Sequence, residues 1–179
     1  CQAEIIWDYD VAHQSHRADF VLLLNTDLKS VLPGSIRQLL GSCARPGIGL
    51  VGSKVIAGNR VFQCGFWKKE ADSRSREESF PQEDVWIPRF TNLPCRFKGY
   101  FRRAYLSAEV DAVSPDLAVM SRGALESLEK SQVREKIRRN EQEEDLKQEE
   151  GDGFSLNGWP DICSRLKESG CKIIVDPAS

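Results

Sequence analysis

The sequence predicts an α/β fold, in which helices pack on both faces of a largely buried sheet. Residues 19–24 form an almost continuous apolar stretch, which is typical of a strand inside such a sheet. A helix signal follows at residue 33, and β-prone segments follow from residue 48. Residues 160–169 and 172–175 again predict a helix and then a strand. Strands and helices that alternate along one chain indicate the α/β class.

The composition is that of an ordinary globular chain, with 40% hydrophobic and 29% charged residues among 179. Lys and Arg total 25 against 27 Asp and Glu, so the net charge of -2 gives no electrostatic reason to expect nucleic acid as a partner. The longest unbroken apolar run, Phe20 to Leu24, is far shorter than the ~20 residues of a membrane helix. The chain opens at Cys1 without a signal-like segment, so we expect a mature or cut piece.

The first strand, over residues 19–24, is expected to be buried on both faces because it is apolar almost throughout. A Pro-Gly-Ser step at residue 33 then opens a short helix, which Gly41 closes. Residues 48–56 predict a strand, and residues 61–67 predict its partner across a tight turn. The apolar face of the short helix carries Ile36, Leu39 and Leu40.

The middle of the chain, residues 68–109, is polar and interrupted by three prolines. A stretch of this length without periodicity is typical of a functional loop region or of partial disorder. Its aromatic residues between positions 80 and 105 either pack this loop or form a platform for a sugar ring.

The last third of the chain returns to regular patterns. Residues 110–120 predict an extended segment, and residues 123–130 predict a helix. From residue 129 to 150, 14 of 22 residues are charged, which predicts a solvated helix or a disordered insertion. The final helix has Pro160 in its first turn and Gly170 just past its end, as helix termini favour.

Six cysteines occur, none in a Cys-x-x-Cys pair, so a zinc knuckle or a thioredoxin-type site is not expected. Buried free thiols that act as small apolar residues are the simplest interpretation. The even number also permits disulfides, but the spacing selects no pairing and leaves the redox compartment open.

Asn25 and Asp27 come directly after the first strand. In an open α/β sheet, ligands bind outside the carboxyl ends of the strands. One Asp with a neighbouring amide suits Mg²⁺ or Mn²⁺, which takes few protein ligands and completes its shell with phosphate oxygens and water. An Asp after a strand is also a common turn former, so the spacing alone supports both interpretations.

Four segments, in order, resemble family 2 glycosyltransferases, which have the GT-A (nucleotide-diphospho-sugar transferase) fold. The first, DFVLLLNTDLKSVLPGSIRQLL, resembles the strand that ends in Asn-Pro-Asp, a variant of the metal-binding Asp-x-Asp motif. The second, IGLVGSKVIAGNRVFQCGF, resembles the next strand and hairpin. The third, VDAVSPDLAVMSRGALESL, resembles the Val-Asp-x-Val-Ser-Gly-Ala strand, and the fourth, NGWPDICSRLKESGCKIIVDPAS, resembles the last catalytic helix and strand. The rhamnosyl- and hexosyltransferase branch is the most similar.

The resemblance implies one partial GT-A-like domain over residues 1–179, with a Rossmann-like mixed sheet flanked by helices and a charged insertion at about 129–150. It also implies a metal-assisted, inverting transfer of a sugar from a nucleoside-diphosphate sugar to an acceptor hydroxyl. The acceptor would be a glycan, a lipid-linked molecule or a protein. The compartment would be cytoplasmic or membrane-associated for a bacterial-type enzyme, and Golgi or ER for a eukaryotic one.

The resemblance also implies roles for single residues. Asp27 matches the carboxylate that meets Mg²⁺ or Mn²⁺ on the donor diphosphate, and Asn25 matches the first member of that triplet. Asp161 matches the general base, which takes the proton of the attacking acceptor hydroxyl. Arg165 is a neighbour of the diphosphate or a residue of the helix surface.

The sequence departs from the family pattern in the late helix, where the family usually has Glu-Asp-x-Asp. Without gaps, Asp161 falls on the second Asp, and Gly158 and Trp159 occupy the base positions. A two-residue deletion instead places Asp161 on the base itself. Asp161 as a structural helix-start carboxylate, favoured by the helix dipole, and a missing base are the other possibilities.

Two further departures concern the strand blocks. Ser114-Pro115-Asp116 stands where the family has Ser-Gly-Ala, and proline removes a backbone donor. The first strand and loop, which in the family hold the nucleotide base, would lie before residue 1. We therefore expect a truncated chain or a degenerate relative.

Other interpretations of the sequence stay open. A non-catalytic GT-A-like module that binds a sugar nucleotide or a protein partner is the first, and an unrelated α/β binding domain is the second. Four residues near the start, which precede the metal strand of the family, form a weaker candidate metal cluster: Asp8, Asp10, His13 and His16.

Overall fold

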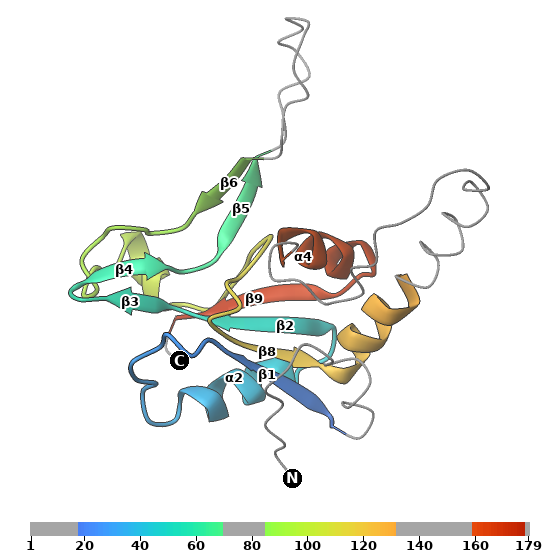
Figure 1. Cartoon of the computed structure of the whole chain (residues 1–179). Helices are drawn as coiled ribbons and strands as arrows, with labels where there is room; N and C mark the ends of the chain where they lie inside the picture. The colour runs from blue at the N-terminus through green and yellow to red at the C-terminus, as the bar shows by residue number, and fades with distance from the viewer. Residues whose placement is uncertain (1–17, 70–84, 132–158, 178–179) are drawn as a thin grey trace, which may run out of the picture.

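The computed structural model describes residues 18–69, 85–131 and 159–177. Their centre is a five-stranded sheet with the order β1-β8-β2-β9-β7 (Figure 1). The strands are β1 (Phe20–Leu24), β2 (Ile48–Ser53), β7 (Ala108–Glu109), β8 (Leu117–Ser121) and β9 (Lys172–Asp176). A mixed sheet flanked by helices confirms the predicted α/β class.

Strand directions bring the ends of three strands to one edge of this sheet. β1 and β2 each pair antiparallel with β8, which lies between them, and β2 pairs parallel with β9. β1, β2 and β9 therefore run in the same direction and end at the same edge of the sheet, which we call the carboxyl edge. The start of β8 lies at this edge too, because Leu117 is opposite Leu24 in the register.

Helices cover the two faces of the sheet (Figure 1). On one face, α2 (Ser35–Cys43) buries Leu39 and Cys43 against β2 and β8. On the other face lie α4 (Trp159–Glu168) and the helix over residues 122–131. These two helices share a larger apolar cluster with the sheet, to which α4 contributes Ile162, Cys163 and Leu166. The final helix and strand are thus confirmed, with Gly170 in the left-handed region at φ 85° after the helix end.

Two hairpins leave the sheet after β2. β3 (Val55–Ala57) pairs with β4 (Arg60–Gln63), and β5 (Phe66–Lys69) pairs with β6 (Val85–Pro88). In Figure 1 both hairpins extend away from the sheet on the same side. They are followed by η1 (Tyr100–Tyr105), a 3-10 segment broken by left-handed backbone at Phe101 and Arg102.

Some sequence expectations were wrong in detail. Gly41 does not close its helix, which continues to Cys43 because that side chain is buried in the sheet contact. The first strand is not buried on both faces: Leu22 and Leu24 are 41% and 53% exposed, since β1 is the last strand at its side of the described sheet. The strand expected over residues 48–56 is interrupted at Lys54, where the chain passes from the sheet into the first hairpin.

Three of the five described cysteines are buried free thiols, as predicted, whereas Cys95 and Cys171 are free but only partly buried. All five described cysteines are free, and Cys43, Cys64 and Cys163 are buried. Burial raises the pKa of the Cys43 and Cys163 thiols to about 12, so these groups stay protonated and unreactive near neutral pH.

Gly52 allows the segment before β8 to lie directly on β2. A Cβ at this position would lie 2.4 Å from the Cβ of Val113, which is 1% exposed. Such a distance is far below van der Waals contact, and a β-branched side chain has little rotamer freedom with which to move away. The close approach therefore requires glycine, and it fixes the position of residues 113–116 at the carboxyl edge.

We predict that Gly52→Ala lowers the free energy of unfolding by about 1–3 kcal/mol, because the added methyl group overpacks a filled site. Urea denaturation measures the change. Gly41→Ala is the matched control: its added Cβ meets nothing within 4 Å on an exposed helix face, so we expect stabilisation of up to about 1 kcal/mol. Equal effects of the two substitutions would contradict this packing.

Candidate functional site

The residues that follow β1 form a turn at the carboxyl edge. The backbone N–H of Asp27 donates to Oδ1 of Asn25 at 3.0 Å, which is an Asx-type turn. The backbone N–H of Asn25 donates to the Asp116 carbonyl at 2.8 Å, and its Nδ2 donates to Asp116 Oδ1, also at 2.8 Å. Asn25 thus fixes both the turn and the contact with the segment before β8.

Asp116 joins three parts of the chain. Besides Asn25, its carboxylate accepts hydrogen bonds from Nε2 of Gln63, at the end of β4, and from Oγ of Ser114 at 2.5 Å. A carboxylate has room for about four such bonds, so three donors can share it without competing. We call Asn25, Gln63, Ser114 and Asp116 the polar cluster.

Asp27 lies next to the polar cluster but outside its hydrogen bonds. Its side chain is exposed, and no hydrogen bond reaches its carboxylate within the described ranges. The sequence interpretations of Asp27 as a turn former and as a ligand are therefore compatible. The turn uses its backbone N–H and leaves the carboxylate available to a ligand.

α4 reaches the carboxyl edge with its first turn. Trp159 is 5% exposed, and its Nε1 donates to the carbonyl of Val113 at 2.5 Å. This bond holds the start of α4 next to the segment that leads to Asp116. Asp161 lies in the first turn and is exposed, so the dipole of α4 favours its negative charge. Arg165 lies one turn further along the same side of α4 and is half-buried.

The contacts thus connect the sequence candidates along one path. Asp161 and Trp159 share the first turn of α4, Trp159 binds Val113, and the polar cluster leads from there to Asn25 and Asp27. Trp159 has a structural role, because its buried indole binds the carbonyl of Val113. Asp27 and Asp161 line neither of the two cavities described next.

The larger cavity, about 360 Å³, lies between the β5–β6 hairpin and α4. Asp111 accepts a bond from the backbone N–H of Lys68 at 2.8 Å and forms an ion pair with Lys167. Burial raises the pKa of the Asp111 carboxyl, but the bonds from Lys167 and Lys68 outweigh it and hold the pKa below its usual value. The charges of Asp111 and Lys167 are paired with each other, which is typical of a structural contact.

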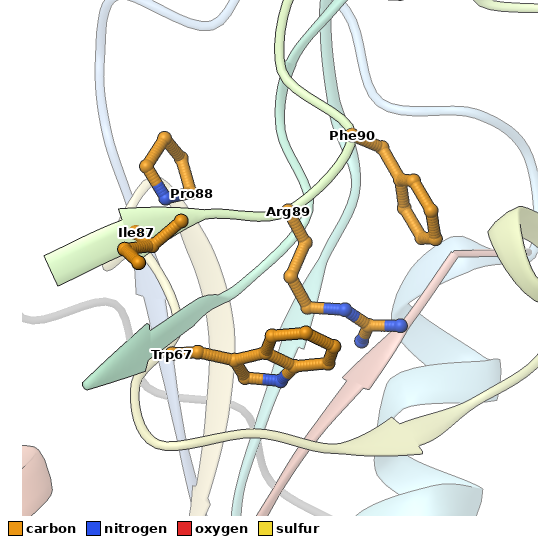
Figure 2. Close-up of a pocket in the computed structure, with 5 residues that line it drawn as sticks. All are labelled: Trp67, Ile87, Pro88, Arg89 and Phe90. Atoms are coloured by element: carbon orange, nitrogen blue, oxygen red, sulfur yellow. The ribbon is translucent and has the colours of Figure 1, made fainter. Parts of the chain in front are cut away.

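The smaller cavity, about 210 Å³, lies at the base of the same hairpin and is lined by Trp67, Ile87, Pro88, Arg89 and Phe90 (Figure 2). All of these residues except Trp67 fall in the segment 68–109, for which the sequence predicted a functional loop region or partial disorder. In its described part, this segment contributes β6 and the end of β5 to a strand pair, and residues 89–99 form turns and irregular backbone.

Sequence reasoning missed the role of two acids. It treated Asp116 only as a departure from a family pattern, although Asp116 is the centre of the polar cluster. Asp176 is 2% exposed and accepts bonds from Oγ of Ser42 at 2.8 Å and Nε2 of Gln38 at 3.0 Å, which tie α2 to the end of β9. The hydrogen bonds of both acids join residues far apart in the chain, so no local sequence pattern predicts them.

Comparisons with known proteins add no relatives: no family model, curated protein or solved structure matches this chain. Within the described ranges, no three His, Cys, Asp or Glu side chains gather in a way that would hold a metal. The helices described there are all too short or too polar to cross a bilayer. The early cluster of Asp8, Asp10, His13 and His16, and most of the charged segment 129–150, lie outside the described residues.

We predict that Asp116→Asn lowers the free energy of unfolding by about 1–3 kcal/mol, because an amide group would turn a donor toward donors already in place. Thermal unfolding of the purified chain measures it. Asp19→Asn is the control, since Asp19 is an exposed acid at the opposite end of β1. Loss of stability in both variants, or in neither, would show that Asp116 does not organise the polar cluster.

Proposed function

We propose that this protein is a glycosyltransferase of GT-A type. It transfers a sugar from a nucleoside-diphosphate donor to an acceptor hydroxyl, with inversion and with the help of a divalent cation. The observation that carries the proposal is that two acids far apart in the chain, Asp27 after β1 and Asp161 at the start of α4, lie toward the same edge of the sheet, connected through the Trp159–Val113 and Asn25–Asp116 bonds. Carboxyl edges of this kind are where α/β sheets bind nucleotides.

The arrangement of the four resembling segments supports the proposal. They contribute β1, β2, β8 and β9, and these are the four neighbouring strands of the sheet. The four segments thus supply four adjacent strands of the five-stranded sheet, as consecutive parts of one GT-A-like domain would. Their loops converge on the carboxyl edge, where the polar cluster joins the first, second and third segments.

The available oxygen atoms fit a hard divalent cation. Within the described residues, Asp27 offers a carboxylate without a hydrogen bond, and Asn25, whose Oδ1 accepts the Asp27 N–H, also binds the carboxylate of Asp116. Mg²⁺ is commonly held by one or two carboxylates and takes its other ligands from phosphate and water. Asp27 would hold the cation, which when bound neutralises the charge that develops on the leaving diphosphate. Asn25 orients the turn that presents this carboxylate.

Asp161 is our candidate general base. Its carboxylate is exposed in the first turn of the helix, where it can accept the proton of an acceptor hydroxyl. The bond from Trp159 to Val113 positions this turn relative to the polar cluster. Arg165, one turn behind, provides a positive charge on the same side of α4 for the donor diphosphate.

A second candidate function is a non-catalytic module that binds a sugar nucleotide or a protein partner. One observation favours it: Asp116 stands where the resembling family has a small residue, and it engages the side chain of Asn25. A carboxylate at that point would repel the sugar diphosphate unless a cation lay between them. The two candidates share the binding site and differ in turnover.

We predict that nucleoside diphosphates bind the full chain more tightly with Mn²⁺ than without it. Asp27→Asn should reduce the metal-dependent affinity about tenfold, since one charge-assisted ligand is lost. Isothermal titration calorimetry measures both quantities, and Asp19→Asn serves as the matched control that keeps wild-type affinity. A nucleoside-diphosphate affinity that changes neither with Mn²⁺ nor with Asp27→Asn would contradict the metal site.

Release of nucleoside diphosphate from nucleotide sugars tests catalysis separately. We predict that Asp161→Asn lowers turnover roughly 10²- to 10⁴-fold while binding of the diphosphate is retained, because only the proton acceptor is removed. Glu168→Gln, at the other end of α4, is the control. Metal-dependent binding without any turnover in the wild-type chain would identify the non-catalytic module instead.

A further inference from the structure

Arg89 is an almost fully buried cation at the base of the β5–β6 hairpin. Its side chain is 9% exposed, and its guanidinium carbon lies 5.2 Å from the centre of the Trp67 ring and 5.0 Å from that of Phe90. Figure 2 shows the guanidinium beside the Trp67 indole, with the Phe90 ring at its other side. These cation–π contacts partly offset the loss of hydration of the charge.

The rings leave the hydrogen-bond donors of Arg89 unsatisfied. Nε and Nη1 are buried and have no acceptor in the described part of the chain. A guanidinium interacts with aromatic faces above and below its plane, whereas its N–H groups donate within that plane. A buried charged donor without an acceptor is costly, so a side chain that only filled space here would more favourably be apolar.

The surroundings of Arg89 are positive. The titratable groups that perturb its pKa are the Cys64 thiol and the Arg103 guanidinium, of which only Arg103 carries a charge near neutral pH. Burial is the main cause that lowers the pKa of Arg89, Cys64 counteracts it, and Arg103 lowers it further. Lys54 also lies within electrostatic range of Cys64. An arginine keeps its proton in such a place, so the excess positive charge persists.

We propose that the cavity of about 210 Å³ lined by Trp67, Ile87 and Arg89 is a binding site for an oxoanion, a carboxylate or phosphate group of a small ligand. Oxygen atoms of the anion accept the in-plane N–H bonds that the protein leaves open, and Arg103 adds a second positive charge. Trp67 is 51% exposed and Ile87 is 45% exposed, so both offer apolar surface to the uncharged part of the ligand. The proposal is independent of sugar transfer. The site is nevertheless close in sequence to the polar cluster, because the carbonyl of Gly65, two residues after Gln63, accepts the backbone N–H of Arg89.

Thermal unfolding of the full chain at constant ionic strength tests this site with three probes: inorganic phosphate, glucuronate and glucose. We expect phosphate or glucuronate, but not glucose, to raise the unfolding midpoint in a saturable manner, as a ligand of the native state does. A larger rise of the midpoint with phosphate indicates a phosphate ligand, and a larger rise with glucuronate indicates a carboxylate ligand. A wild-type midpoint that neither anion moves would overturn the proposal.

Substitutions assign the effect to Arg89. Arg89→Met should abolish the response to the anions and keep or raise the midpoint without them, because an unpaired buried charge is removed. Arg37→Met, at an exposed position of α2, should leave the response intact. If Arg89→Met does not fold, Arg89→Lys takes its place, and we expect about tenfold weaker anion binding from the loss of the planar donor group. An anion response that is unchanged in the Arg89 variant measured would contradict the assignment.

Discussion

The antiparallel strand β8, placed between the parallel strands β1 and β2, is the constraint on which the rest of the structure depends. Its register with β1 puts Leu117 opposite Leu24, so the residue before β8 meets the residue after β1. The two hydrogen bonds between Asn25 and Asp116 follow directly, although the residues are 91 positions apart. Gly52 makes the same placement possible from β2, because only a residue without Cβ admits Val113.

The polar groups at the carboxyl edge differ in how well the chain satisfies them. Asp116 and Asp176 accept bonds from several side chains, and these bonds connect elements distant in sequence. Asp27 and Asp161 are different, because both are exposed acids. Arg89, at the base of the β5–β6 hairpin, has buried Nε and Nη1 groups for which the described part of the chain supplies no acceptor. Charged groups that a fold positions and does not itself neutralise are those most suited to ligands.

Much of the fold was predictable because its signals are local. Each of these signals spans only a few consecutive residues: the apolar run of β1, the proline and glycine at the ends of α4, and the turn between β3 and β4. The exposure of Leu22 and Leu24 was not predictable, because it depends on which strands are neighbours in the sheet. The same limit applied to the site. Asn25, Asp27 and Asp161 stood out as residues at strand and helix ends, whereas the role of Asp116 required knowledge of long-range pairing.

Arg89 illustrates this limit most clearly. In the sequence it lies between Pro88 and Phe90, within a stretch that the sequence analysis treated only as part of one long polar segment. Its burial arises from the pairing of β5 with β6, which puts Trp67 opposite Ile87, and from Phe90 on its other side. The hairpin thereby removes from water an arginine side chain, a type that is usually exposed at the surface.

The most direct measurement of the central claim is paramagnetic broadening of backbone amide signals by Mn²⁺ in the presence of a nucleoside diphosphate. We expect the amide signals of residues 25–28 and of Ser114, Asp116 and Leu117 to broaden first, since both segments meet at the carboxyl edge. Those of Gly47 and Arg122, at the opposite edge of the sheet, should persist. Broadening centred on the opposite edge, or signals that Mn²⁺ leaves unchanged throughout, would contradict a cation site at Asp27.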